Sequence, residues 1–312
     1  MSDFSIFCND DKIIEIYRTH SEYKELIENI RNYYDFLFCI QENNFHQIVT
    51  ISMIENIPSL VKINNENYRT LIFEELKNRM NFKHIDLGSI MGNCRTTLYS
   101  IFRTVEVVNL ADTFTLLRKF KDDMFLFIYF LRLSNMNEHD VDSIEKLKVW
   151  NKHVKNAFDW SSNQMRNVYS KHIISLLLTD PSINKISEEI GLFKYFDGFT
   201  KTLNNHAHSN GISFLNKLNP EFILKPSLET FEFINQNLNI IMGYLFSIIF
   251  YLSDDYLMDP EYNDLSSIDI TPEENLLYKV SPMIQGFIDN VINRIDPKLK
   301  TFLVENTAMN IE

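Results

Sequence analysis

The residues of this sequence best suited to chemistry lie in one stretch, residues 192–215, which reads LFKYFDGFTKTLNNHAHSNGISFL. On a helix, at about 100° per residue, Lys201 and His208 point in nearly the same direction, with Asn204 and Asn205 flanking them. An ammonium group stabilises negative charge, and an imidazole near neutral pH can both give and take a proton. The spacing therefore predicts that these four side chains can converge on one ligand.

The other face of the same helix is apolar and recurs at three- and four-residue steps. Its members are Leu192, Tyr195, Phe196, Phe199, Leu203 and His206. The pattern predicts that this face packs against the rest of the chain, with His206 as a core histidine. Asn210 and Gly211 end the helix, because both accept the left-handed backbone conformation. His208 then lies in the last turn, where the helix dipole favours the charged imidazolium.

Each of these residues also has a purely structural interpretation. A histidine in a last turn can simply bond the final carbonyl groups, and Lys201, Asn204 and Asn205 can be ordinary solvent-exposed surface. A zinc site is disfavoured, because His206 and His208 diverge by about 200° on a helix and no cysteine or carboxylate completes the set. We expect neither a metal nor another cofactor.

Composition predicts a large helical protein. The chain has 312 residues, 45% of them hydrophobic, with only 7 Gly and 8 Pro and no sustained period-two alternation. The fold class expected is therefore all-α, a multi-helix bundle. A net charge of -12 repels phosphate backbones and argues against a general nucleic-acid coat protein, but it leaves room for a local basic pocket.

The compartment expected is the cytoplasm, without a membrane span. Cys8, Cys39 and Cys94 are isolated, which fits a reducing compartment, and the N-terminus lacks the pattern of a signal peptide. The most apolar run, residues 238–252, is short for a membrane span and reads as a helix buried in the core.

Helical periodicity divides the chain into segments. Helices are expected over about residues 13–41, 45–57, 66–80, 87–108, 112–131, 144–158, 163–178 and 227–252, and from 271 onwards with breaks at Pro282 and at Asp296–Pro297. The basic residues Arg118, Lys119 and Lys121 alternate with acidic ones, which favours a solvated face over a phosphate site. Three regions are expected: 1–86, a core over 87–253, and a C-terminal extension over 254–312, unless the chain forms one continuous domain.

The central stretch resembles the HEPN superfamily of all-α proteins. Members carry Arg, then four to six residues, then His, and the ending LNNHAHSNG with a basic residue one turn upstream is similar. The segments CRTTLYSIFRTVEVV and LLRKFKDD resemble the preceding helices, so the resemblance covers roughly residues 87–252. Lys201 stands where the family has Arg, and a flexible point charge replaces a planar fork.

The resemblance implies metal-independent RNA cleavage in a prokaryotic antiviral, stress or toxin system. His208 would then transfer protons, Lys201 would stabilise charge, and Asn204, Asn205, Arg95 and Arg103 would bind the substrate. It further implies RNA as a partner, a homodimer, and a partner protein from the same operon. The alternative is a non-catalytic helical module that binds a protein or a nucleotide; a purely structural assembly subunit is a third possibility.

Overall fold

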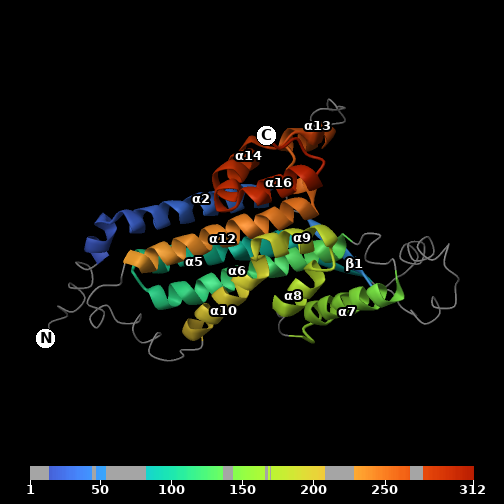
Figure 1. The fold of residues 1–312 in the computed structure, drawn as a ribbon, viewed down its shortest axis with the longest axis horizontal. Helices are drawn as coiled ribbons and strands as arrows, with labels where there is room; N and C mark the ends of the chain where they lie inside the picture. The colour runs from blue at the N-terminus through green and yellow to red at the C-terminus, as the bar shows by residue number, and fades with distance from the viewer. Residues whose placement is uncertain are drawn as a thin grey trace. The chain divides into compact units, whose positions relative to one another are not determined.

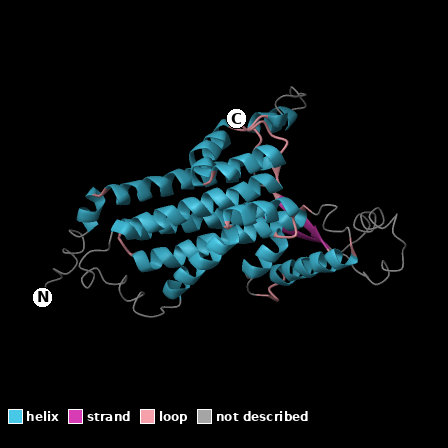
Figure 2. Cartoon of the chain, viewed as in Figure 1, coloured by secondary structure: helices cyan, strands magenta, loops and turns pink. Residues whose placement is uncertain are grey.

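The chain is predominantly helical. The computed structural model describes residues 14–43, 47–53, 82–135, 143–165, 168, 170–207, 228–267 and 277–312. Within these ranges almost every element is a helix, and strands occur only as one two-stranded sheet (Figure 2). The predicted all-α fold class is therefore confirmed.

The chain forms two compact units, each assembled from three separated segments. Unit 1 contains residues 1–43, 91–124 and 191–245, and unit 2 contains residues 44–90, 125–190 and 246–312. The helices of unit 1 are α2 (Ser21–Asn43), α10 (Leu192–Ala207), and parts of α5 (Leu87–Glu106), α6 (Leu110–Ser134) and α12 (Leu228–Leu252) (Figure 1). The boundaries expected after residues 86 and 253 stay predictions.

Polar side chains join α2 to α12 inside unit 1. Asn29 Nδ2 donates to Asn235 Oδ1 at 2.9 Å, Asn235 Nδ2 donates to Glu25 Oε1 at 3.1 Å, and Tyr33 Oη donates to Asn239 Oδ1 at 2.7 Å. The partners repeat every four residues on both helices, so one face of each helix meets the other along its length. These hydrogen bonds fix how α2 and α12 are aligned along their axes. If one helix were shifted along the other, the buried polar side chains would lose their hydrogen-bond partners.

The apolar face predicted for α10 is buried. Leu192, Phe196, Phe199 and Leu203 are at most 5% exposed. On α12, Asn237 accepts a hydrogen bond from Tyr195 Oη, and Phe233 packs against Phe199 with ring centroids 6.3 Å apart. Burial of four large apolar side chains thus fixes which face of α10 remains open to solvent.

Unit 2 contains a two-stranded sheet that corrects one sequence prediction. Residues 45–57 were expected to form a helix, yet Ile48–Ser52 form strand β1, which pairs antiparallel with β2 (Phe82–Asp86). Alternate residues of β1 are buried, with Ile51 fully enclosed, as half-buried strands require. The expected helix over 66–80 lies outside the described residues.

Some of the remaining helices of unit 2 begin at side-chain caps. These remaining helices are α7 (Ile144–Ser161), α8 (Ser170–Leu177), α9 (Pro181–Ile190), α13 (Pro260–Ser267), α14 (Pro282–Phe287), a π-helix at Ile288–Ile292, α15 (Asn293–Ile295) and α16 (Pro297–Asn306), with a short 3₁₀ turn at Asp254–Tyr256. Asp180 and Asp296 cap α9 and α16, each followed by proline at the first helical position. The break predicted at Asp296–Pro297 is confirmed.

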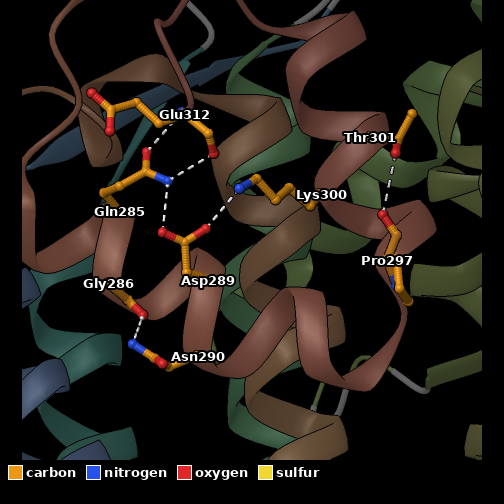
Figure 3. Close-up of polar contacts among 8 residues, drawn as sticks. All are labelled: Gln285, Gly286, Asp289, Asn290, Pro297, Lys300, Thr301 and Glu312. Carbon is orange, nitrogen blue, oxygen red and sulfur yellow. Dashed lines mark hydrogen bonds and ion pairs between the residues drawn. The ribbon is translucent and has the colours of Figure 1, made fainter.

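The C-terminal segment of unit 2 is tied down by a polar network (Figure 3). Gln285 Nε2 donates to the backbone oxygen of Glu312 at 3.1 Å, and the Glu312 N–H donates to Gln285 Oε1 at 3.2 Å. Asp289 accepts from both Gln285 and Lys300, the latter at 2.7 Å. Helix α14 begins at Pro282, so the break expected at this position is confirmed. The helix start expected at residue 271 lies outside the described residues.

Three further helix ends differ from the sequence prediction. The first long helix is interrupted at His20, whose N–H bonds the oxygen of Tyr17 in a tighter turn. The cap of α6 is Asn109 and not Asp112, because Val108 adopts a left-handed conformation and Asn109 Oδ1 accepts the N–H of Asp112. The helix expected from residue 163 begins at Ser170 in the structure.

Helix α12 is the most apolar helix described. By length and composition it could cross a membrane, but 78% of its most apolar window is buried inside the protein. This agrees with the interpretation of residues 238–252 as a core helix.

Candidate functional site

Lys201 lies on the solvent side of α10. Its ammonium group pairs with Asp197 one turn earlier, at 3.0 Å, and its side chain is 76% exposed. An exposed pair between neighbouring turns contributes little stability, about 0.3–0.5 kcal/mol, so the ammonium group can be drawn to another anion at small cost. The pairing is a feature that the sequence reasoning did not include.

The other members of the predicted cluster are only partly described. Asn204 is half-buried, and its Oδ1 is buried without a hydrogen-bond partner among the described residues. The side chain of Asn205 and all of His208 lie outside the described residues, as does the side chain of His206. The convergence of Lys201 and His208 on one ligand therefore stays a prediction.

Arg95 and Arg103, the two substrate-binding candidates on α5, have different surroundings. The guanidinium group of Arg95 lies over two rings of α2, at 5.7 Å from the centroid of Tyr34 and 5.1 Å from that of Phe38. Arg103 is 61% exposed and forms an ion pair with Glu106 at 2.6 Å. Arg95 is therefore part of a contact between two helices, whereas the charge of Arg103 is compensated locally.

Arg95 belongs to a continuous surface that we call the aromatic–arginine face. Its members are Arg31, Tyr34 and Phe38 of α2 and Arg95, Tyr99 and Phe102 of α5. Within the face, Arg31 lies 5.1 Å from the Phe102 centroid. The Tyr99 ring lies 6.0 Å from that of Tyr34 and stacks on that of Phe102 at 6.3 Å. Rings and guanidinium groups from the two helices thus alternate across the surface.

The face forms because of the spacing on each helix. On both α2 and α5 its members are three or four residues apart, which places them on one side, while residues such as Leu37 and Leu98 on the other sides are fully buried. Cation–π pairs of this kind contribute about 0.5–1 kcal/mol each at exposed sites. Phe38 remains 44% and Tyr99 51% exposed, so the face presents open aromatic surface to a ligand.

A cavity of about 330 Å³ opens on this face. It is lined by Ile30, Arg31, Tyr34, Asp35, Tyr99 and Phe102. Asp35 is exposed, and its carboxylate forms no hydrogen bond or ion pair with any described residue. The cavity thus combines aromatic walls, a guanidinium group and an unpaired hydrogen-bond acceptor, the composition of a small ligand site.

The basic residues of α6 form a second cluster, and Lys121 alone among them contradicts the expectation of a solvated face. Lys121 is 1% exposed; its ammonium group donates to Thr200 Oγ1 at 2.6 Å and pairs with Asp122 at 3.0 Å. Burial lowers the pKa of Lys121, and the neighbouring Asp122 opposes this effect. Lys119, whose side chain is 53% exposed, pairs with Asp123, and Arg118 pairs with Asp122 at 3.7 Å, so neighbouring carboxylates compensate the charges of this cluster.

Within the described ranges, no three His, Cys, Asp or Glu side chains gather closely enough to hold a metal ion. The aromatic–arginine face was not identified from the sequence, although Arg95 was. The signal was present as Tyr, Phe and Arg at helical spacing opposite an apolar stripe, but only the pairing of α2 with α5 joins the two half-faces.

No protein-family model, no curated protein and no solved structure matches this chain, so its assignment to a family stays a prediction.

Proposed function

We propose that this protein binds single-stranded RNA on its aromatic–arginine face. The observation that carries the proposal is the alternation of rings and guanidinium groups on one surface: Arg95 lies over two rings of α2, and Tyr99 beside them is 51% exposed. Unpaired bases have two open π-faces, and they stack on aromatic side chains and on guanidinium planes. The half-exposed rings of Phe38 and Tyr99 supply such stacking surfaces.

Charge supports the same assignment. Arg31 and Arg95 contact rings and form no ion pair with any residue in the described part of the chain. Their positive charge is therefore available to phosphate groups, whose attraction dominates affinity for nucleic acids. Since the whole chain carries a net charge of -12, we expect binding to be confined to this face and to be of moderate affinity.

Cleavage of RNA at Lys201 and His208 is a separate proposal, which rests on the resemblance of residues 192–215 to HEPN proteins and not on the aromatic–arginine face. His208 would take the proton from the ribose 2′-hydroxyl, and the 2′-oxygen would attack the adjacent phosphorus while its bond to the 5′-oxygen breaks and an acid protonates that leaving oxygen. Lys201 would leave Asp197 to stabilise the negative charge of the phosphate during this step. His208→Ala and Lys201→Ala are expected to abolish cleavage while leaving RNA binding intact. Full cleavage by both variants would refute the catalytic assignment without touching the binding assignment.

The binding proposal is tested by fluorescence anisotropy with a labelled single-stranded oligonucleotide. Tyr99→Ala is expected to weaken binding by about 5- to 160-fold, because base–aromatic stacking contributes about 1–3 kcal/mol per base. Tyr278→Ala is the matched control, since Tyr278 is also a half-exposed tyrosine, at 39%, and lies outside the face. Equal affinity of Tyr99→Ala and the wild type would refute the proposal.

A protein ligand is the second candidate for the same face. Tyrosine and arginine are the residues most often found at energetic centres of protein interfaces, and the acidic surface suits a protein better than RNA. Size-exclusion chromatography separates the two candidates: a dimer that dissociates in Tyr99→Ala, in a chain that binds no RNA, would favour the protein ligand.

A further inference from the structure

We infer that the cavity of the aromatic–arginine face selects guanine among the bases of single-stranded RNA. The inference rests on the proposed RNA binding and adds a specificity to it. The observation behind it is that Asp35, which carries a carboxylate, lines the same cavity as Tyr34 and Tyr99.

The Asp35 carboxylate is available to a ligand. It lies one helical turn from Arg31, yet the Arg31 guanidinium group is stacked over Phe102 at 5.1 Å, and no ion pair joins the two side chains among the described contacts. An aromatic cavity could be built without any carboxylate, and a negative charge opposes the approach of phosphates. The Asp35 carboxylate has a function in the lining of the cavity if it accepts hydrogen bonds from donors on a base.

The chemistry of the base edges decides which base this is. An ionised carboxylate only accepts hydrogen bonds, through two oxygens side by side. Guanine presents two adjacent donors on its Watson–Crick edge, the N1–H and the 2-amino group. Adenine and cytosine each present one amino group beside an accepting ring nitrogen, and uracil presents one N–H between two carbonyl oxygens. Two charge-assisted hydrogen bonds are therefore available to guanine alone.

The dimensions of the cavity suit one base. At about 330 Å³ it lies at the small end of known ligand pockets, which span about 300–1,000 Å³. A base stacked against Tyr99 would turn its edge towards Asp35, while its sugar and phosphate remain outside, within reach of Arg31. One nucleotide of an RNA strand would be read in this way, and its neighbours would be bound without selection.

The experiment measures affinity for short oligouridines that carry one central guanosine, adenosine, cytidine or inosine. For the wild type we expect guanosine to bind about 10-fold more tightly than adenosine, since a charge-assisted hydrogen bond contributes about that factor or more. Inosine, which keeps the N1–H but lacks the 2-amino group, should lie between them. A wild-type chain that binds all four oligonucleotides equally would overturn the inference.

Asp35→Asn tests the role of the carboxylate, because the amide keeps the shape but offers one donor and one acceptor. It should bring guanosine and adenosine to within about twofold of each other. Glu28→Gln is the matched control, since Glu28 is another exposed acid of α2 that does not line the cavity, and it should leave the preference intact. A guanosine preference that survives in Asp35→Asn would also overturn the inference.

The outcomes separate the inference from the proposed function. Equal binding of all four oligonucleotides that is still lost in Tyr99→Ala would refute guanine selection and leave RNA binding standing. Binding of none of them would refute the proposed function. In that case free guanosine and adenosine, titrated by calorimetry, decide whether the cavity takes a nucleoside, and a chain that binds neither overturns the inference as well.

Discussion

The salt dependence of RNA binding tests which guanidinium groups of this protein meet phosphates. Arg31 and Arg95 contact rings and no described carboxylate, whereas Arg103 is paired with Glu106 at 2.6 Å. Two available charges predict a slope of about -1.4 for log affinity against log salt concentration, at about -0.7 per phosphate contact on a single strand. Affinity should then fall about sevenfold between about 50 and about 200 mM salt.

Three variants test which arginine side chains produce this salt dependence. Arg31→Gln and Arg95→Gln should each halve the slope to about -0.7, so that the same change of salt weakens binding only about 2.6-fold. Arg103→Gln should leave the slope unchanged, because Glu106 already compensates its charge. The assay is anisotropy of one labelled oligonucleotide at several salt concentrations. The reasoning fails if the slope is the same in all three variants, or if Arg103→Gln lowers it as much as the other two.

Further predictions concern stability. Burial raises the pKa of Tyr129 and Tyr256, and likewise that of Tyr33, Tyr195 and Tyr251, so the contribution of these tyrosines to stability is complete below pH about 10 and is lost above it. Each should remove about 1.4 kcal/mol from the free energy of unfolding at pH about 11, measured by urea denaturation, and an unchanged free energy of unfolding would contradict their burial. Asn235→Ala should lower the free energy of unfolding by about 1–3 kcal/mol, because it leaves the side chains of Asn29 and Glu25 on α2 without this partner. A melting temperature equal to that of the wild type would contradict this role of Asn235 between α2 and α12. Lys121→Met should change stability by less than about 1 kcal/mol or increase it, since replacing a buried charge removes its desolvation cost; a loss of several kcal/mol would show that the bond to Thr200 is essential.

The helices with strong periodicity could be predicted from the sequence, and the sheet could not. The predicted starts and ends of α7 and α12 agree with the structure to within a few residues, because a long amphipathic or apolar pattern determines a helix locally. Strand β1 has only five residues, and its partner Asp86 for Ile48 lies far along the chain. Such a pairing depends on tertiary contacts, so the short apolar run was misinterpreted as a helix.

The polar residues were less predictable, for the same reason. Lys121 lies on a helix face of mixed charge, a pattern that suggests solvent exposure. Its ammonium group is instead buried and donates a hydrogen bond to Thr200 of α10. Arg95 was identified as a binding candidate from a resemblance, and the structure gives it a different setting, between two rings of α2. A single helix cannot reveal either partner, because each comes from a helix distant in sequence.

The extent of the aromatic–arginine face limits how much RNA can be bound. Two of its rings, Phe38 and Tyr99, are about half exposed, so stacking is available to about two bases. Beyond them α2 exposes the carboxylates of Glu28 and Glu42, which repel the phosphates of a longer strand. A tetranucleotide should therefore bind nearly as tightly as a dodecanucleotide, apart from the small statistical gain of a strand that offers several registers. Affinity that rises steeply and continuously with length would mean that the strand follows a longer basic groove, and the confinement of binding to this face would then be wrong.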